Sequence, residues 1–549
     1  MSDPTLQTPA ARPTTREALL RRRRSWFFGL SGEQAAKLLF QGNATISIIV
    51  LALITFTIFS DAVGFIPQNR ENLETYRRAG LELVDMLRGQ VQSHSALSRY
   101  LSSARQEELA RLTGPGGIAL PEANARLEAF DAYADRYANS IGDHETILGE
   151  MTDMVSSLKE RHAVAADLRA ARQNLIDGMR TAPAERAATL KAEADAMEIE
   201  TIDFAAEIKP LLAMRPAVAE ANVRLVQSLK ELSGAVPAAE APALRRKLER
   251  FKDLNVRYIA EISDTEKRIM AWDQTKPVGI LESLSAFAFG RKWVTASFWQ
   301  DWYGIIPLFA GSLLIALLAL VIAIPLGVAA AIYVNQVATA GEQKFIKPTI
   351  EFIAAIPSVV LGFFGIAVLG QTLRQVSQSP WLDWVPGFPM LERLNSATAA
   401  CLLALMAVPT IFSLAEDAIN NVPRSFKEAS LALGATRLQT IIRIVIPAAL
   451  SGIMAAILLG FGRVIGETMV VLLCAGNRIE IPDFSAGFGA VFQPVHTMTG
   501  IIAQEMGEVV RHSIHYRALF MVGVVLFLIS MLINWLAQKI VRRYRISIG

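Results

Sequence analysis

Two opposite charges stand four residues apart in a long apolar run near the end of the chain. Arg463 and Glu467 belong to the segment Gly462-Arg-Val-Ile-Gly-Glu-Thr-Met469. On a continuous helix, residues i and i+4 share a face, so the two charges can neutralise each other. A charge inside a membrane span costs about 2.5–3.5 kcal/mol to insert and is rare without a partner or a function. The guanidinium fork of Arg463 matches an oxyanion, so a transported anion could compete with Glu467 for it, with a purely structural ion pair as the alternative.

Other residues that could do chemistry are sparse. The chain has no G-x4-G-K-[ST] sequence, so we expect no ATP binding through such a loop and no enzyme activity of its own. His512 and His515 stand three apart without an evident third ligand, so no metal site is predicted. Cys401 and Cys474 both lie in apolar runs, which argues against a disulfide framework or a thiolate cluster.

The composition indicates that a bilayer surrounds the elements positioning Arg463 and Glu467. Of 549 residues, 52% are hydrophobic and 19% are charged. Residues 301–549 hold only 29 of the 105 charged residues, so the two halves of the chain lie in different solvents. The net charge is +3, and no basic face interleaved with aromatic residues is evident, which argues against nucleic-acid binding.

Six apolar runs are each long enough to cross a hydrocarbon core of roughly 30 Å as a helix. They lie at about residues 44–66, 303–335, 348–371, 396–415, 448–474 and 516–540. The Arg-rich leader, residues 1–43, predicts an inside N-terminus, and an even number of spans returns the basic C-terminal tail to the same side. A cleavable signal peptide is the alternative for the leader. A possible capping box from Ser31 to Gln34 also predicts a short helix at the membrane interface.

Residues 67–295 are hydrophilic and predicted to form a helical domain outside the membrane. A stripe with 3-4 spacing runs from Leu248 to Ile269, and a second runs from Leu73 to Val91. Glycines and prolines, such as those at 114–117, Pro216 and Pro242, divide the region into several helices. Either a structural or partner-contacting bundle or an external sensor or docking module fits this pattern.

Three spans contain prolines, namely Pro325, Pro357 and Pro409. Broken helices are tolerated in membranes where a cavity or neighbours satisfy the freed carbonyls, so these prolines favour helices around a pathway. Ordinary kinked packing is the alternative.

A loop between the fourth and fifth spans, at about residues 416–447, has a pattern suited to docking. It reads Glu428-Ala429-Ser430-Leu-Ala-Leu-Gly434, then nine residues, then Ile444-Val-Ile-Pro447. Small residues and Gly434 allow close approach of a partner, and Pro447 marks the start of the next span. This loop resembles the E-A-A-x3-G-x9-I-x-L-P signature of permease subunits of bacterial ABC importers. The resemblance implies that the loop forms the coupling helix docked in a groove of the ATP-hydrolysing subunit, through Glu428, Ala429, Ser430, Gly434, Ile444 and Pro447.

The G-R-x-x-G-E-T-M segment, with the segment from Ile356 to Phe364 and Glu416-Asp417-Ala418, is similar to the PstC type of permease from high-affinity phosphate importers. That resemblance covers roughly residues 300–540 and the first span. It implies a substrate path that includes Arg463, Glu467, Thr468, Pro357 and Ser358. It further implies a second permease of the PstA type, a homodimeric ATPase that holds ATP and Mg²⁺, and a periplasmic phosphate-binding protein. The insert after the first span departs from the compact members of the family.

We therefore expect an all-α membrane protein with six transmembrane helices of the ABC importer permease type and a large extracytoplasmic helical insert. The expected parts are residues 1–43 (leader), 44–66 (first span), 67–295 (periplasmic domain) and 296–549 (permease core). The expected location is the bacterial inner membrane with both termini cytoplasmic, and the expected substrate is inorganic phosphate, with no cofactor in this chain. A permease for sulfate or molybdate and a membrane sensor are the alternatives.

Overall fold

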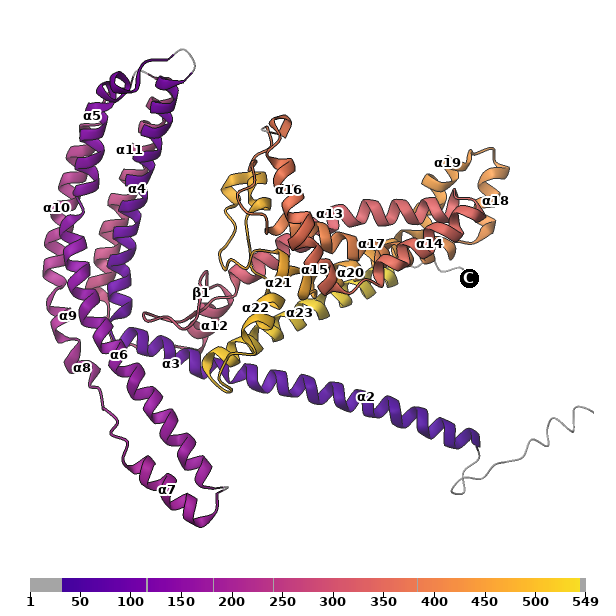
Figure 1. Cartoon of the computed structure of the whole chain (residues 1–549), viewed down its shortest axis with the longest axis horizontal. Coiled ribbons are helices and arrows are strands. Elements are labelled where there is room, and N and C mark those ends of the chain that lie inside the picture. The colour runs from indigo at the N-terminus through magenta and orange to yellow at the C-terminus, as the bar shows by residue number, and fades with distance from the viewer. Residues whose placement is uncertain (1–31, 115–116, 181, 240, 383, 544–549) are drawn as a thin grey trace, which may run out of the picture.

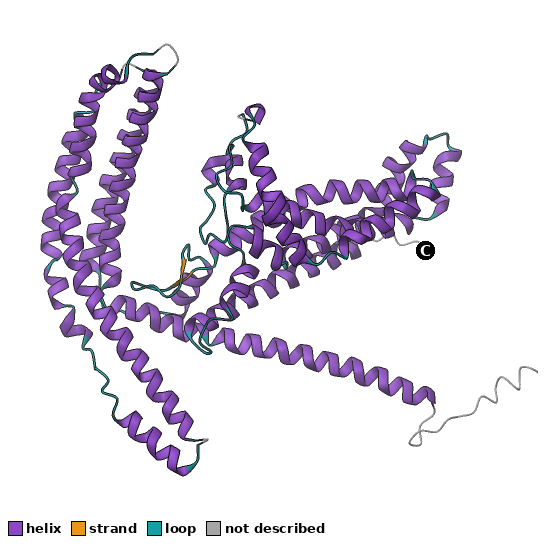
Figure 2. Cartoon of the chain, viewed as in Figure 1, coloured by secondary structure: helices purple, strands orange, loops and turns teal. Residues whose placement is uncertain are grey.

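The computed structural model describes residues 32–114, 117–180, 182–239, 241–382 and 384–543, which are almost entirely helical (Figures 1 and 2). Within these residues one small antiparallel sheet pairs β1 (Trp293–Val294) with β2 (Trp302–Tyr303). Residues 1–31 of the Arg-rich leader and residues 544–549 of the basic tail lie outside the described residues. Residues 32–43, which include the second half of the predicted interfacial helix, do not form a separate helix, because they are continuous with the first span in α2 (Gly32–Val63).

Six helical segments are long and apolar enough to cross a membrane, as predicted. Their bounds are Ala36–Arg78, Ile306–Gln336, Ser358–Ser377, Ser396–Asn420, Arg437–Ile465 and Ile514–Ile540. The first combines most of α2 (Gly32–Val63) with α3 (Phe65–Arg78). Many apolar side chains of α2 face outward, including Phe56 at 70% exposure, which gives a surface suited to lipid.

Four long helices form the centre of the core: α13 (Ile306–Gln336), α17 (Ser396–Asn420), α20 (Ile446–Ile465) and α23 (Ile514–Arg543). The helices α17 and α20 approach closely because small residues face each other. A Cβ built on Gly452 would overlap the Ala418 methyl, and one built on Gly460 would lie 2.8 Å from Ile411. Pro325 and Pro409 lie inside α13 and α17 without ending them, so these two prolines fit ordinary helix packing.

The predicted third and fifth spans each contain a break in the helix. The apolar helices therefore have other bounds than predicted, namely Ser358–Ser377 instead of 348–371 and Arg437–Ile465 instead of 448–474. The predicted third span, 348–371, contains the end of α14 (Ala340–Ala354) and all of α15 (Ser358–Phe364), which begins directly after Pro357. A π-helical turn (Gly365–Leu369) and α16 (Gly370–Ser377) follow. The predicted fifth span, 448–474, contains a break after α20, and α21 (Met469–Cys474) follows that break.

The loop between α17 and α20 is itself helical. It contains α18 (Arg424–Ala432), α19 (Arg437–Thr440) and a π-helical turn (Ile441–Val445) that leads directly into α20. Between α21 and α23 lie a 3-10 segment, η4 (Phe484–Phe492), and α22 (Met498–Glu505).

The insert, residues 67–295, is a helical bundle that lies crosswise to the spans. Figure 1 shows α4, α5, α10 and α11 side by side, with α6 and α7 extending to the other side of α3. The bounds are α4 Leu81–Thr113, α5 Leu120–Asn139, α6 Gly142–Met179, α7 Ala184–Asp195, α8 Phe204–Glu207, α9 Lys209–Ala213, α10 Arg215–Gly234, α11 Pro242–Ala271 and α12 Ile280–Ala288.

The predicted stripe on α11 forms the inner face of this bundle. All seven of its positions are buried: Leu248, Phe251, Asn255, Tyr258, Ile262, Thr265 and Ile269. Pro216 and Pro242 stand in the first turns of α10 and α11, where a missing N–H costs no helical hydrogen bond. The sequence therefore predicted the buried face of α11 and the division into helices at these two prolines.

A polar layer lies inside the otherwise apolar bundle. The Oδ1 atom of Asn222 on α10 accepts from Gln90 Nε2 at 2.7 Å and lies 2.8 Å from Nε2 of His144 on α6. His94 on α4 stacks on the Tyr137 ring with centroids 4.6 Å apart, and its Nε2 lies 2.9 Å from the Tyr137 carbonyl oxygen. These side chains come from four helices, so the layer fixes their register.

A buried arginine joins the insert to the first span. Arg77 on α3 is 9% exposed. It donates to Glu82 on α4 at 2.9 Å, to Glu282 on α12 at 2.6 Å and to the Lys276 carbonyl at 3.0 Å. One side chain thus holds α3, α4 and the return segment of the insert in a fixed arrangement.

Candidate functional site

Arg463 and Glu467 do not share a helix face, which corrects the prediction from their spacing. Arg463 stands in the last turn of α20, which ends at Ile465 with Gly466 as its C-terminal cap. The backbone leaves the helix at Gly466, and the next helix begins at Met469. Within the described part of the chain, no ion pair joins the two residues.

Glu467 instead stabilises the helix that follows it. Its Oε1 atom accepts a hydrogen bond from the Met469 N–H at 3.2 Å, which satisfies a free donor at the start of α21. Thr468 stands at the N-cap position of α21, but its own side chain makes no capping bond. The Thr499 hydroxyl donates to the Glu467 carbonyl oxygen at 2.8 Å and so satisfies an acceptor within the break.

Arg463 is exposed and has no hydrogen-bond or ion-pair partner among the residues that the structure describes. It nevertheless lies within the span Arg437–Ile465. A guanidinium group cannot be left in hydrocarbon without cost, so its fork requires a partner chain, water or an anion.

The interrupted third span packs against α21, the helix that follows the break in the fifth span. The Pro357 ring precedes α15, Ser358 is the first residue of that helix, and α15 packs on α21. The contact is close because a Cβ built on Gly362 would lie 2.5 Å from Leu473, while Cys474 Sγ donates to the Gly362 carbonyl at 3.3 Å. The two short helices α15 and α21 therefore each begin after a break and lie together. Pro357 directly precedes α15, and Glu467 and Thr468 directly precede α21.

Three hydroxyl side chains lie among apolar residues around a small cavity beside Glu467 that the sequence did not reveal. The cavity measures about 10 Å³ and is lined by Ser312 of α13, Thr497 and Thr499 together with Glu467. Ser312 accepts from the Met498 N–H at 2.9 Å, and Thr497 accepts from the Gly500 N–H at 3.0 Å. Only the tertiary fold brings these residues near Glu467.

The predicted coupling residues form part of an open groove. Ala429 and Ser430 of α18 and Ile444 and Pro447 beyond it line a cavity of about 560 Å³. Glu428 is exposed on the same short helix, and Gly434 ends that helix with a positive φ of 83°, a conformation that glycine adopts without strain. The hydroxyls of Ser430 and Thr440 lie 2.9 Å apart and hold α18 against the segment before α20.

Two further apolar residues belong to this groove. Phe426 and Leu433 also line it, and Leu433 is 89% exposed. None of the side chains of α18 is buried. An apolar groove without cover at the end of a membrane protein has the character of a docking surface. The amphipathic spacing of residues 426–433 was the signal that could have identified Phe426 and Leu433.

The buried carboxylate of Glu416 links three helices near the loop through one ion pair and one hydrogen bond. Glu416 on α17 is 9% exposed, and it accepts from Lys347 on α14 at 3.0 Å and from Asn335 on α13 at 2.9 Å. The sequence drew attention to Glu416 only as part of a motif, because its partners lie far away along the chain.

No group of three or more possible metal ligands is present among the described residues. His512 precedes α23 in a turn, and His515 bonds Glu505 at 2.7 Å, so the two histidines do not form one helical pair.

Comparisons with known proteins place the core in one family. Residues 323–546 match the family model described as binding-protein-dependent transport system inner membrane component. The chain is 35% identical to a probable ABC transporter permease protein, YqgH, of Bacillus subtilis, over 43% of this chain and 72% of that protein. It is 29% and 30% identical to the phosphate transport system permease proteins PstC of Pasteurella multocida and Mesorhizobium japonicum, over 48% of this chain and 83% and 82% of those proteins. The family model begins after the insert.

Proposed function

The chain belongs to the family of ABC transporter permeases, in which it resembles the PstC type, and from this we propose that it helps to form the membrane path of an ATP-driven phosphate importer. The chain is a multi-pass inner-membrane transport subunit. Its partner in the path is a second permease of the PstA type, and a periplasmic phosphate-binding protein delivers the anion.

The exposed guanidinium of Arg463, which has no partner among the described residues, is the observation that supports this path most directly. Because Glu467 is engaged at the start of α21, Arg463 does not have to be released from an ion pair before it meets an anion. Five donors in a planar fork suit a tetrahedral oxyanion. The residues of this chain bind and orient the ion and break no bond.

The groove around Ala429 and Leu433 accepts a homodimeric ATPase that carries ATP and Mg²⁺. Movement of this loop is transmitted to α17 and α20, since the loop joins them directly and their backbones pack through Gly452 and Gly460. The two helices move as one body, and Arg463 at the far end of α20 moves with them.

The loop end of the core faces the cytoplasm in this proposal. Lys539 and Arg542 lie near the end of α23, which Figure 1 places on the same side of the core as α18. Basic residues on that side agree with retention in the cytoplasm, and the insert is then periplasmic.

Phosphate uptake by cells carrying Arg463→Gln, with co-purification of the ATPase as a check on assembly, tests the proposal. We expect assembly to persist and uptake to fall at least about a hundredfold, because a neutral amide offers neither the charge nor the fork. Normal uptake would remove Arg463 from the path. Competition by sulfate or molybdate would identify a different oxyanion as the substrate.

A further inference from the structure

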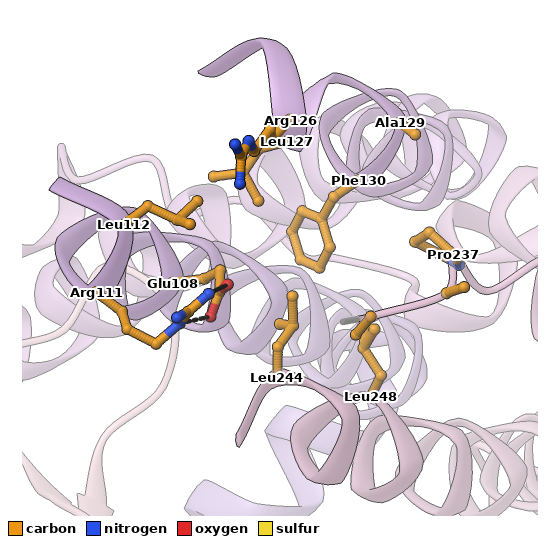
Figure 3. Close-up of a pocket in the computed structure, with 12 residues that line it drawn as sticks. Glu108, Arg111, Leu112, Arg126, Leu127, Ala129, Phe130, Pro237, Leu244 and Leu248 are labelled. Atoms are coloured by element: carbon orange, nitrogen blue, oxygen red, sulfur yellow. Dashed lines mark hydrogen bonds and ion pairs between the residues drawn. The ribbon is translucent and has the colours of Figure 1, made fainter. Parts of the chain in front are cut away.

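A cavity of about 440 Å³ opens near the far end of the insert, where α4 ends and α5 begins. It lies between the last turns of α4, the middle of α5, the first turns of α11 and the loop that carries Pro237 (Figures 1 and 3). This cavity is separate from the groove and the path residues of the membrane core.

The floor of the cavity is apolar and well packed. Leu127, Phe130 and Leu248 are each 4% exposed, and Leu244 is 8% exposed. Figure 3 shows the Phe130 ring pointing from α5 toward Leu244. A short hydrocarbon chain that contacts this floor would remove its own apolar surface from water.

Charged groups line the same cavity beside this floor. Glu108 is 8% exposed and accepts from Nε and Nη2 of Arg111 at 3.0 and 2.6 Å, which holds that guanidinium in a fixed orientation (Figure 3). The buried carboxylate is thereby neutralised.

Arg126 is held more weakly. It bonds Glu122 at 3.0 Å, and the two side chains are 53% and 56% exposed. Solvent screens a surface pair of this kind, so Arg126 can turn to a ligand at little cost.

We propose that this cavity binds a small organic anion, namely a carboxylate on a short apolar chain. The carboxylate pairs with Arg126, and the chain covers Phe130 and Leu244. The volume lies within the usual range for small-molecule sites. An inorganic anion would not contact the apolar floor, and an uncharged molecule would not use the arginine.

Calorimetric titration of the full-length protein in nanodiscs with butanoate, hexanoate and octanoate tests the site. At least one should bind saturably below about 10 mM, and Arg126→Gln should weaken it about tenfold or more. Arg136→Gln, an exposed arginine of α5 that does not line the cavity, should leave binding unchanged. Ala129→Trp, which fills the cavity from an exposed position, should abolish binding while Arg126 remains.

Three results would overturn the proposal. They are no saturable binding of any of the three carboxylates, unchanged binding in Arg126→Gln, and binding of hexanol or inorganic phosphate as tight as that of the best carboxylate. None of them bears on phosphate uptake by the core.

Discussion

The Thr499 hydroxyl donates to the main-chain carbonyl of Glu467, 2.8 Å away and 32 positions earlier in the chain. The bond joins α22 to the break between α20 and α21. Thr499 is 6% exposed, so the bond is shielded from bulk water. The position of the break therefore depends on a residue outside the motif that contains it.

Replacing Thr499 by Val should leave this carbonyl without a donor and destabilise the core by about 1–3 kcal/mol. We expect subunit assembly to persist and phosphate uptake to fall severalfold, while Thr499→Ser retains uptake. Thr372→Val is the matched control, because that exposed hydroxyl bonds only its own helix at Val368. Equal uptake by the Val and Ser variants would show that the bond does not matter for transport.

Arg463 and Glu467 should behave as independent sites in stability. Because Glu467 caps α21 and makes no ion pair with Arg463, the destabilisation of the double variant Arg463→Gln/Glu467→Ala should equal the sum of the single effects within about 0.5 kcal/mol. Glu467→Ala alone should cost about 1 kcal/mol as a lost cap. Thermal unfolding in detergent measures these free energies. A coupling energy above about 1 kcal/mol would show that Arg463 and Glu467 interact directly.

Changing Leu433 to Asp should weaken docking of the ATPase and so reduce transport. A carboxylate at this 89% exposed position would oppose burial in an apolar contact. We expect weaker co-purification of the ATPase and little phosphate uptake, with membrane insertion unchanged. Leu438→Asp places the same charge on a 66% exposed leucine of α19 that does not line the groove. Identical losses in both variants would mean that the groove is not the specific contact.

A methyl group at Gly452 should disturb the movement of α17 with α20. The added Cβ would overlap the Ala418 methyl, and overpacking of this kind costs about 1–3 kcal/mol. Gly462→Ala should be tolerated, since its nearest neighbour would lie 3.8 Å away. Thermal stability and uptake should fall together for Gly452→Ala only, and a stable, active Gly452→Ala protein would show that the helices can separate without effect.

Acid should weaken the insert through His94. Burial lowers the pKa of His94 to about 4, because the protonated ring would bring a charge and a second N–H into a site where Nδ1 has no partner. Between about pH 6.5 and 4 the unfolded chain binds more protons than the folded one, so stability falls as the pH falls through this window and levels off below it. The loss from this residue is about 3 kcal/mol in total.

Limited proteolysis of the full-length protein at increasing temperature gives the unfolding temperature of the insert. The change of this temperature between pH 7 and pH 4 measures the effect. His94→Gln should reduce the dependence on pH, although it also weakens the bundle at pH 7. A pH profile identical to that of the wild type would assign the effect to other groups.

The sequence predicted those features that depend on neighbouring residues. The spans follow from long apolar runs, and the buried face of α11 follows from its 3-4 spacing. The face shared by Arg463 and Glu467 was predicted wrongly because the spacing argument assumes a continuous helix, and Gly466 ends that helix.

Other features depend on contacts between distant segments. The hydroxyls of Ser312 and Thr499 meet Glu467 only in the folded core, and Lys347 meets Glu416 across two helices. Single-sequence periodicity contains no information on such pairs. The loop was better predicted, since four of its six predicted residues line one groove.

The fixed attachment of the insert at Arg77 gives the molecule a long mechanical arm. Helix α4 contains 33 residues and is therefore about 50 Å long. If α3 tilts by about 5° during transport, simple geometry moves the far end of α4 by about 4 Å. A change too small to see easily among packed membrane helices would then be large enough to follow with a spectroscopic label at the tip of the insert.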